Sequence, residues 1–495
     1  MNRIRWSPLW AGLLIVALLW PLALPGQLAL RDMLVLDSPA LSAGALGTGD
    51  LPARNAPQDG VLAVAGIWLP ASWVARLMIL GGAVAGAWGA VLLARTRRAG
   101  PVATLAALTL TLWNPAVVER LLQGHWSLVI AAWLLPLIAA AGLTGRTHLQ
   151  WGALWAASLT PTGGLFALLT ALATARGRRL PTALIGLLCC LPWLLPGLLL
   201  SGGATGAASV AAFAPRSEGW PGGQAGTVIS VLGLGGIWNA DAVPLSRTLG
   251  FALVGVVLSA LLLTRVRHVP GPLLVLAGLG LGGALLPVLL PDLWTTALTT
   301  VPGAGLLRDA SKLTLLAVPA WVAAAASVNR WAGVILALAL LQVPDAPRAL
   351  APLTPQEITV DESLVERAAG RDVLLADATP LTLRPDGTVI VEPLTKALPT
   401  VESGALTVDG VLVDPPAPRW SAAMDAWGSQ DLGRLAELGV GLVLDDGQVT
   451  EIPGVEPRSR VLGLSLLAVW SAVPLLVAVL RLRRGRAAAP RNARP

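Results

Sequence analysis

Long apolar runs separated by short polar segments dominate this chain. Many of the runs approach the length of about 20 residues that an α-helix needs to cross a bilayer. The pattern predicts an all-α polytopic membrane protein with about 12 transmembrane helices, in a range of 11–13. The expected spans are an apolar run that ends at residue 30 and residues 73–94, 101–118, 127–144, 150–161, 164–175, 181–200, 248–264, 271–290, 312–328, 331–344 and 461–480.

Two details of this layout need interpretation. The spans 150–161 and 164–175 are short and are separated by a Thr-, Pro- and Gly-rich segment, so they form either two full spans or a broken, re-entrant hairpin. The first run begins with Arg3 and Arg5 like a signal peptide, but it is long and lacks a good cleavage site. We therefore expect an uncleaved first span.

Composition supports the membrane assignment. The 495 residues are 55% hydrophobic and only 13% charged, whereas soluble domains carry about 25% charged residues. This excludes a soluble enzyme, a disordered protein and a fibrous one. The two cysteines, Cys189 and Cys190, are adjacent in an apolar run, and the chain has three histidines and no tyrosine. A metal site made of several histidines is therefore not expected, and a tyrosine nucleophile is excluded.

The distribution of arginines predicts the orientation. With both termini in the cytoplasm of a multi-pass plasma-membrane protein, the inner segments hold 18 arginines and no acid, so all 28 Asp and Glu lie elsewhere. This follows the positive-inside rule, and no nucleic-acid partner is needed to explain the net charge of +7. The arginines are Arg3, Arg5, Arg95, Arg97, Arg98, Arg146, Arg176, Arg178, Arg179, Arg265, Arg267, Arg330, Arg481, Arg483, Arg484, Arg486, Arg491 and Arg494.

This orientation puts the long loops outside and divides the chain into three parts. Residues 1–345 form a multi-span domain with outer loops 31–72, 201–247 and 291–311. Residues 346–460 hold 18 of the 28 acids and alternate strand-like runs with a helix that ends at Gly439, which predicts a small extracytoplasmic α/β domain. Residues 461–495 form the last transmembrane helix and a basic cytoplasmic tail.

Three polar clusters on the outer side are candidates for chemistry. In the first loop, Asp32 closely follows the first apolar run, and Asp59 lies further along. A carboxylate at the membrane boundary costs desolvation unless it is paired or useful. Asp32 is therefore either a general base that deprotonates an acceptor hydroxyl or, together with Arg31, a marker of the interface.

The second cluster is the short turn 113–126, in which polar groups are dense between two apolar spans. Glu119, Arg120 and His125 are its candidates, and His125 is the only histidine in a predicted outer segment. The alternative is a purely structural role, in which Glu119 and Arg120 form an ion pair at the membrane interface and the flanking tryptophans anchor the helices there.

The third cluster follows an amphipathic segment that starts at Asp292. Arg308 and Lys312 are four residues apart, with Asp309 between them, which would put both cations on one helix face. Such a pair suits a phosphate or pyrophosphate group. The alternative is that both side chains extend to anionic lipid headgroups.

Taken in order, these motifs resemble the GT-C type of membrane glycosyltransferase that uses polyprenyl-phosphate sugars, in particular an actinobacterial branch. The resemblance covers residues 1–330. It rests on Leu30-Arg31-Asp32-Met33, on Asn114-Pro115 through Glu119-Arg120 to Gly124-His125-Trp126, and on Leu307-Arg308-Asp309-Ala310-Ser311-Lys312. The commonest form of the family has two neighbouring acids in the first loop, whereas here Met33 follows Asp32.

The resemblance implies inverting sugar transfer from a polyprenyl-phosphate donor to a cell-envelope glycan or glycolipid at the outer membrane face. Asp32 would be the base. Arg308, Lys312 and Arg120 would bind the donor phosphate. Glu119, His125, Asp309 and Asp59 would position substrate. No cofactor or metal site is required, although use of a divalent cation stays open. Membrane lipid is an expected partner.

Two other classes of function remain open from the sequence. One is a non-catalytic accessory or scaffold protein that works with other proteins of envelope assembly. The other is a lipid or polysaccharide transporter, which is disfavoured because the predicted spans hold almost no charge whereas transport paths have polar groups within them. The sugar, the linkage, the acceptor and the oligomeric state are not determined by the sequence.

Overall fold

The computed structural model describes residues 6–200, 205–384, 386–408 and 410–487. Among these residues eight helices are long and apolar enough to cross a membrane, and four other apolar helical segments are shorter. The polytopic helical fold is thus confirmed, whereas the count of 12 spans stays a prediction. The eight are Trp6–Ala23, Ala71–Thr96, Pro101–Gln123, Trp126–Leu143, Arg179–Leu199, Gly271–Leu289, Ala332–Ala349 and Val461–Arg483, and the shorter ones are Pro161–Thr174, Gly223–Leu232, Arg247–Leu263 and Ala310–Ala325.

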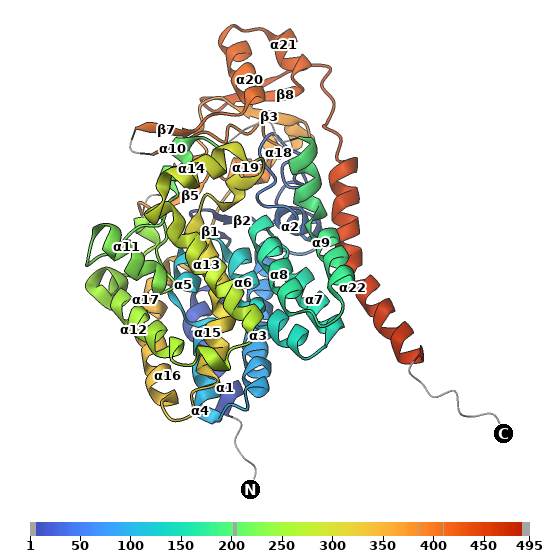
Figure 1. Cartoon of the computed structure of the whole chain (residues 1–495). Helices are drawn as coiled ribbons and strands as arrows, with labels where there is room; N and C mark the ends of the chain where they lie inside the picture. Colours follow the sequence, from blue (N-terminus) through green and yellow to red (C-terminus); the bar gives the residue numbers. More distant parts are fainter. Residues whose placement is uncertain (1–5, 201–204, 385, 409, 488–495) are drawn as a thin grey trace, which may run out of the picture.

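Each predicted span after the first overlaps one or more helices of the bundle, and further short helices lie in the loops (Figure 1). The bundle helices are α1 Trp6–Leu19, α3 Ala71–Thr96, α4 Pro101–Leu112, α5 Pro115–Gln123, α6 Trp126–Leu143, α7 Thr147–Ala157, α8 Pro161–Thr174, α9 Arg179–Leu199, α12 Ala252–Leu263, α13 Gly271–Leu289, α15 Val318–Ala325, α16 Ala332–Leu341 and α22 Val461–Ala487. The loop helices are α2 Gln58–Ala65, α10 Ala207–Ala212, α11 Gly223–Leu232, α14 Pro291–Thr300, α17 Ala346–Ala349 and α19 Leu394–Ala397.

The short pair α7 and α8 forms a helical hairpin against α6. At 1.5 Å per residue, α7 is about 16 Å long and α8 about 21 Å, both less than the roughly 30 Å hydrocarbon core. Thr160 caps α8 by accepting a hydrogen bond from the amide of Gly163, and Pro161 occupies its first turn. These lengths favour the broken hairpin over two full spans.

The first apolar run differs from its prediction as one long span. Helix α1 ends at Leu19, and a short 3-10 helix, Trp20–Ala23, follows it. The run then becomes a β-hairpin of β1, Leu28–Leu30, and β2, Met33–Val35. Prolines at 21 and 25 lack the amide that a continuing helix needs, and Gly26 has a φ of +115°. Asp32 therefore lies in a hairpin turn and does not directly follow a helix.

The acidic C-terminal region has the strands that its pattern predicted. Strand β3, Asp372–Leu375, pairs in parallel with β8, Val440–Asp445, so that Leu374 lies opposite Val443. Strand β9, Gln448–Glu451, is antiparallel to β8. Gly439 ends the preceding helix with a φ of +71°. Two hairpins, β4 Leu381–Leu383 with β5 Val389–Val391 and β6 Leu406–Val408 with β7 Val411–Asp414, and helices α18 Glu362–Ala368, α20 Pro418–Gly428 and α21 Leu432–Glu437 complete it.

This region packs directly on the first outer loop. The amide of Arg31 donates to the carbonyl of Val389 at 2.9 Å, and the amide of Val391 donates to the carbonyl of Arg31 at 3.2 Å. Buried Leu34 and Ile390 belong to one apolar cluster beneath these strands. The turn that carries Asp32 is therefore held between the helical bundle and the C-terminal strands.

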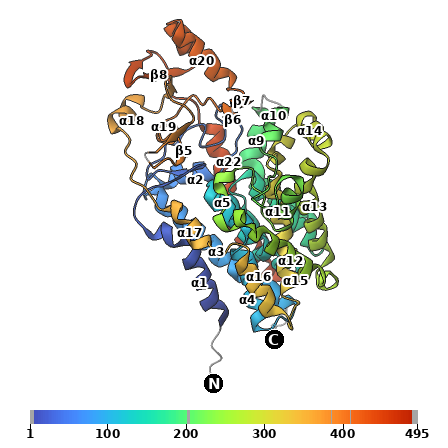
Figure 2. The ribbon, with the colours of Figure 1, turned by 90° about the vertical axis from the view of Figure 1, so that its left-hand side faces the viewer.

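The two ends of the bundle differ. The C-terminal strands and α20 lie together at one end, whereas α1 begins and α22 ends toward the opposite end (Figures 1 and 2). Three basic loops meet at that opposite end, because Arg97 donates to the carbonyl of His268 and the amide of Gly100 donates to Asn329 Oδ1, both at 3.0 Å. Which end faces the cytoplasm stays a prediction of the positive-inside rule.

Candidate active site

The turn of the β1–β2 hairpin docks on the junction between α5 and α6. The amide of Asp32 donates to the carbonyl of Gln123 at 3.2 Å. Gly124, which ends α5, has a φ of +89°, and a Cβ on it would lie 2.3 Å from the backbone nitrogen of Met33. Only glycine satisfies both the left-handed backbone and the close approach. Asn114 starts the same short helix by accepting from the amide of Val117.

Asp32 receives two hydrogen bonds on the same carboxylate oxygen. His125 Nε2 lies 2.9 Å from Asp32 Oδ2, and Gln123 Nε2 lies 3.0 Å from it. Protein surrounds the carboxylate, yet 46% of its side chain is open to solvent. Burial would raise the pKa of Asp32, but the hydrogen bond and charge of His125, the hydrogen bond from Gln123 and the charge of Lys312 together hold that pKa below its usual range. Asp32 is therefore an ionised, water-accessible carboxylate at neutral pH.

The protonation of His125 follows from its second contact. Arg120 Nη1 lies 3.4 Å from His125 Nδ1. A guanidinium can only donate, so Nδ1 accepts and Nε2 carries the proton that is donated to Asp32. Burial and the nearby charges of Lys312 and Arg120 lower the pKa of His125 despite its contact with Asp32. The imidazole is neutral and fixed in one tautomer.

A buried ion pair lies behind the histidine. Arg120 donates two bonds to Asp309, from Nη1 to Oδ2 at 2.6 Å and from Nη2 to Oδ1 at 2.9 Å. Ser311 accepts from Arg120 and donates to Asp309 at 2.8 Å. The side chains of Arg120 and Asp309 are 3% and 5% exposed. Although burial opposes it, the charges of Arg120 and Lys312 keep the pKa of Asp309 far below its usual range, so the pair is fully ionised.

Lys312 completes the cluster and is only partly open to solvent. Its Nζ lies 3.4 Å from Asp309 Oδ2, and its side chain is 20% exposed. Asp309 and Lys312 meet because the segment Ala310–Ala317 is a 3-10 helix, in which residues three apart share a face. The expectation that Arg308 and Lys312 share an α-helical face was therefore wrong.

Arg308 turns instead to the C-terminal strands. Its Nη1 lies 2.8 Å from both carboxylate oxygens of Asp414 at the end of β7 and 2.5 Å from Ser209 Oγ. The guanidinium stacks over Phe213 at 4.0 Å from the ring centre. Arg54, from the first outer loop, reaches Asp414 at 3.9 Å and is 59% exposed. Two cations thus gather on the carboxylate of Asp414, and one of them, Arg54, also lies within electrostatic range of Asp32.

Glu119 lies in a separate buried cluster. Its Oε2 accepts from the amide of Ile237 at 3.2 Å, while Oε1 has no partner among the residues that the structure describes. The neighbouring Glu218 is paired with Arg247 at 2.5 Å, with both side chains fully buried. Glu119 is only 2% exposed, so in this conformation it cannot touch a substrate.

Asp59 is also apart from Asp32. It pairs with Lys396 of helix α19 at 2.6 Å, and the two side chains are 13% and 22% exposed. This contact ties the first outer loop to the C-terminal region. The structure therefore brings together Asp32, Arg120, His125, Asp309 and Lys312, and it leaves Glu119, Asp59 and Arg308 in contacts of their own.

Several residues of the site were not predicted from the sequence. Gln123 binds Asp32 and accepts from Asn239 Nδ2 at 2.7 Å. Arg31 shapes the turn with a φ of +48° and donates to the carbonyl of Asp241 at 2.6 Å. Both contacts join the loop 201–247 to the site. A polar residue at the end of an apolar helix was the available signal for Gln123, whereas nothing local marked Asn239.

The described part of the chain has no group of three or more His, Cys, Asp or Glu side chains arranged to hold a metal ion. What the arrangement does offer is an ionised carboxylate, a neutral histidine that donates to it and a lysine beside it. Such a site can accept a proton from a hydroxyl and can stabilise an anion that forms nearby.

The fold is that of a polytopic membrane protein with small sheets at one end, and solved structures share it. Arabinofuranosyltransferase AftD from mycobacteria superposes with a TM-score of 0.53 over 91% of this chain, at 18% sequence identity. A point mutant of that enzyme gives a TM-score of 0.52 over 91% of this chain at 17% identity. This chain covers 36% and 38% of those two chains. No family model and no curated protein sequence matches it. The likeness concerns the fold.

Proposed function

We propose that this protein is a membrane glycosyltransferase of the cell envelope that uses a polyprenyl-phosphate sugar as donor. The single observation that carries the proposal is the ionised, water-accessible Asp32, held by His125 and Gln123 next to the cation of Lys312. The shared fold with a mycobacterial arabinofuranosyltransferase supports the same class of reaction. The acceptor is a glycan or glycolipid at the outer face of the membrane.

In the proposed step, an acceptor hydroxyl gives its proton to Asp32 while its oxygen attacks the anomeric carbon of the donor sugar. The bond between that carbon and the phosphate oxygen breaks, and polyprenyl phosphate leaves with the electron pair. Attack opposite to the leaving group inverts the anomeric centre. Lys312 is placed to offset the charge of the leaving phosphate.

The remaining residues of the cluster have supporting roles in this proposal. Arg120 is 3% exposed and contacts Asp309, Ser311 and His125, so it positions His125 and Asp309 and does not bind the donor itself. Arg308 can reach a phosphate only when Asp414 releases it. We therefore assign binding of the donor phosphate first to Lys312, and then to Arg308 once Arg308 has left Asp414.

The test is an envelope glycan and glycolipid profile of a deletion strain, complemented at matched expression. Asp32→Asn keeps the shape but removes the base, and we expect a loss of about 100-fold or more in transfer. The matched control is Asp292→Asn, because Asp292 is an exposed carboxylate at the start of α14. The proposal holds if a glycan lost on deletion returns with wild type and Asp292→Asn but not with Asp32→Asn. Full complementation by Asp32→Asn would favour an accessory role.

A further inference from the structure

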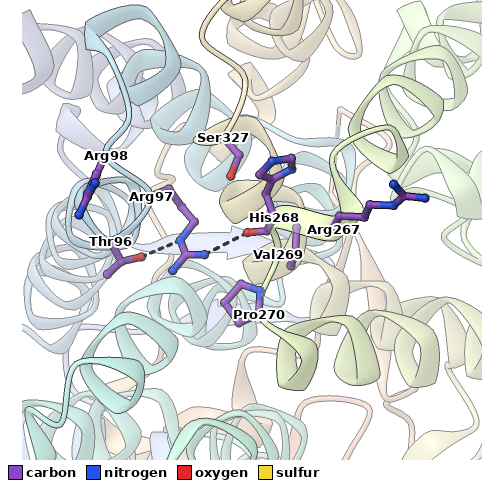
Figure 3. Close-up of a pocket in the computed structure, with 8 residues that line it drawn as sticks. All are labelled: Thr96, Arg97, Arg98, Arg267, His268, Val269, Pro270 and Ser327. Atoms are coloured by element: carbon purple, nitrogen blue, oxygen red, sulfur yellow. Dashed lines mark hydrogen bonds between the residues drawn. The ribbon is translucent and has the colours of Figure 1, made fainter.

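A basic pocket lies at the end of the bundle opposite to the strands. It has a volume of about 340 Å³. Three loops form it: the turn between α3 and α4, the short 3-10 helix Val266–His268, and the end of α15. The lining residues are Thr96, Arg97, Arg98, Arg267, His268, Val269, Pro270 and Ser327 (Figure 3).

The walls of this pocket are tied to one another. Arg97 donates to Thr96 Oγ1 at 3.2 Å and to the carbonyl of His268 at 3.0 Å, which joins the first loop to the second. Arg265 donates to the carbonyl of Ser327 at 2.8 Å, which joins the second loop to the third. The pocket is therefore formed before any ligand arrives, and ordering it adds little cost to binding.

The charge of the pocket is uncompensated. Arg97, Arg98 and Arg267 line it, and no acidic side chain does. Within the described part of the chain, none of the three takes part in an ion pair, and Arg97 Nη2 has no acceptor. Figure 3 shows Arg98 and Arg267 on opposite sides of the pocket with the guanidinium of Arg97 between them. In the same view the side chain of Arg267 points away from that of Arg97, so the three arginines surround the pocket without converging on one point. Their uncompensated charge attracts an anion, and guanidinium groups suit a phosphate oxyanion.

The surroundings favour a lipid as the source of that phosphate. Leu263, at the end of α12, and Val102, in the first turn of α4, are 53% and 44% exposed. Both residues lie on apolar helices next to the loops that form the pocket, so the acyl chains of a lipid could lie along them when its headgroup is in the pocket. Basic pockets between transmembrane helices bind anionic headgroups in this way. We propose that this pocket binds the phosphate of an anionic phospholipid, independently of the transferase site.

The experiment uses the full-length protein in neutral detergent and titrates it with short-chain phosphatidylglycerol, short-chain phosphatidylcholine and inorganic phosphate. Binding is read by isothermal calorimetry. We expect saturable binding of phosphatidylglycerol to wild type, with no heat from phosphatidylcholine. Removing one arginine should weaken binding about fivefold, so Arg97→Gln with Arg267→Gln should weaken it about 25-fold.

The matched control is the double variant Arg146→Gln with Arg176→Gln. Both arginines are exposed and lie in predicted cytoplasmic segments outside the pocket. Equal weakening by both pairs, or equal binding of the two lipids, would overturn the proposal. If inorganic phosphate binds as tightly as phosphatidylglycerol, the lipid source is refuted and the site takes a free phosphate. The single variant Arg267→Gln is the control for misfolding, because the guanidinium of Arg267 donates no hydrogen bond within the described part of the chain.

Discussion

The ion pair between Arg120 and Asp309 gives the sharpest prediction about the framework of the site. Replacing Arg120 by Gln leaves the carboxylate of Asp309 buried, with only Lys312 at 3.4 Å as a charged partner. Breaking a buried pair by removing one partner costs about 3–5 kcal/mol. Because Lys312 remains and is itself 20% exposed, we expect a loss near the lower limit, about 3 kcal/mol in the free energy of unfolding.

The assay is reversible unfolding in mixed detergent micelles, with a matched pair as the comparison. Arg434 and Glu437 are separated by 2.8 Å, but their side chains are 53% and 69% exposed. Arg434→Gln should therefore cause no measurable loss, because solvent screens such a pair. Adding Asp309→Asn to Arg120→Gln should recover part of the lost stability. If Arg120→Gln and Arg434→Gln behave alike, burial does not determine the strength of these pairs and the reasoning fails.

Three further predictions concern the proposed transferase reaction. Gly124→Ala puts a Cβ against Met33 at a φ of +89°, so the turn with Asp32 must move, and transfer measured in membranes should fall about 100-fold; an unchanged rate would contradict the docking argument. Because the pKa of Asp32 lies below its usual range, the base stays ionised as pH falls, so Asp32 should add no acidic limb to the pH–rate profile above about pH 4; an acidic limb near pH 6 that persists in His125→Gln would exclude Asp32 as the base. Asp414→Asn frees Arg308 from a carboxylate at 2.8 Å and should lower the donor KM about fivefold, equivalent to about 1 kcal/mol, whereas an increase in KM would show that the pair itself shapes the donor site.

The transmembrane architecture could be predicted because it depends on local sequence alone. In a bilayer every backbone amide must be bonded within its own helix, so apolar runs become helices without help from distant residues. Each predicted span after the first accordingly overlaps one or more helices. In the C-terminal region, β3, β5, β6 and β8 followed from short strand-like runs, whereas β4, β7 and β9 were not predicted. Gly439 marked the end of a helix.

The site could be predicted only in part, since its residues come from segments distant in sequence. Asp32 and His125 are 93 residues apart, and Arg120 and Asp309 are 189 apart. The sequence identified all four as polar residues at the ends of apolar runs. It could not tell that Glu119, next to Arg120, points into a separate buried cluster, because adjacent residues on a helix face different directions.

The sequence by itself determined where most of the apolar helices lie and which polar residues are candidates for chemistry, because hydrophobic length and desolvation cost act locally. Only the tertiary structure decided the partners. In the tertiary structure residues 28–35 form a hairpin, Arg308 pairs with Asp414, and Lys312 pairs with Asp309. Those choices depend on the packing of the C-terminal strands against the first outer loop, and a contact between distant segments leaves no local signature in either one.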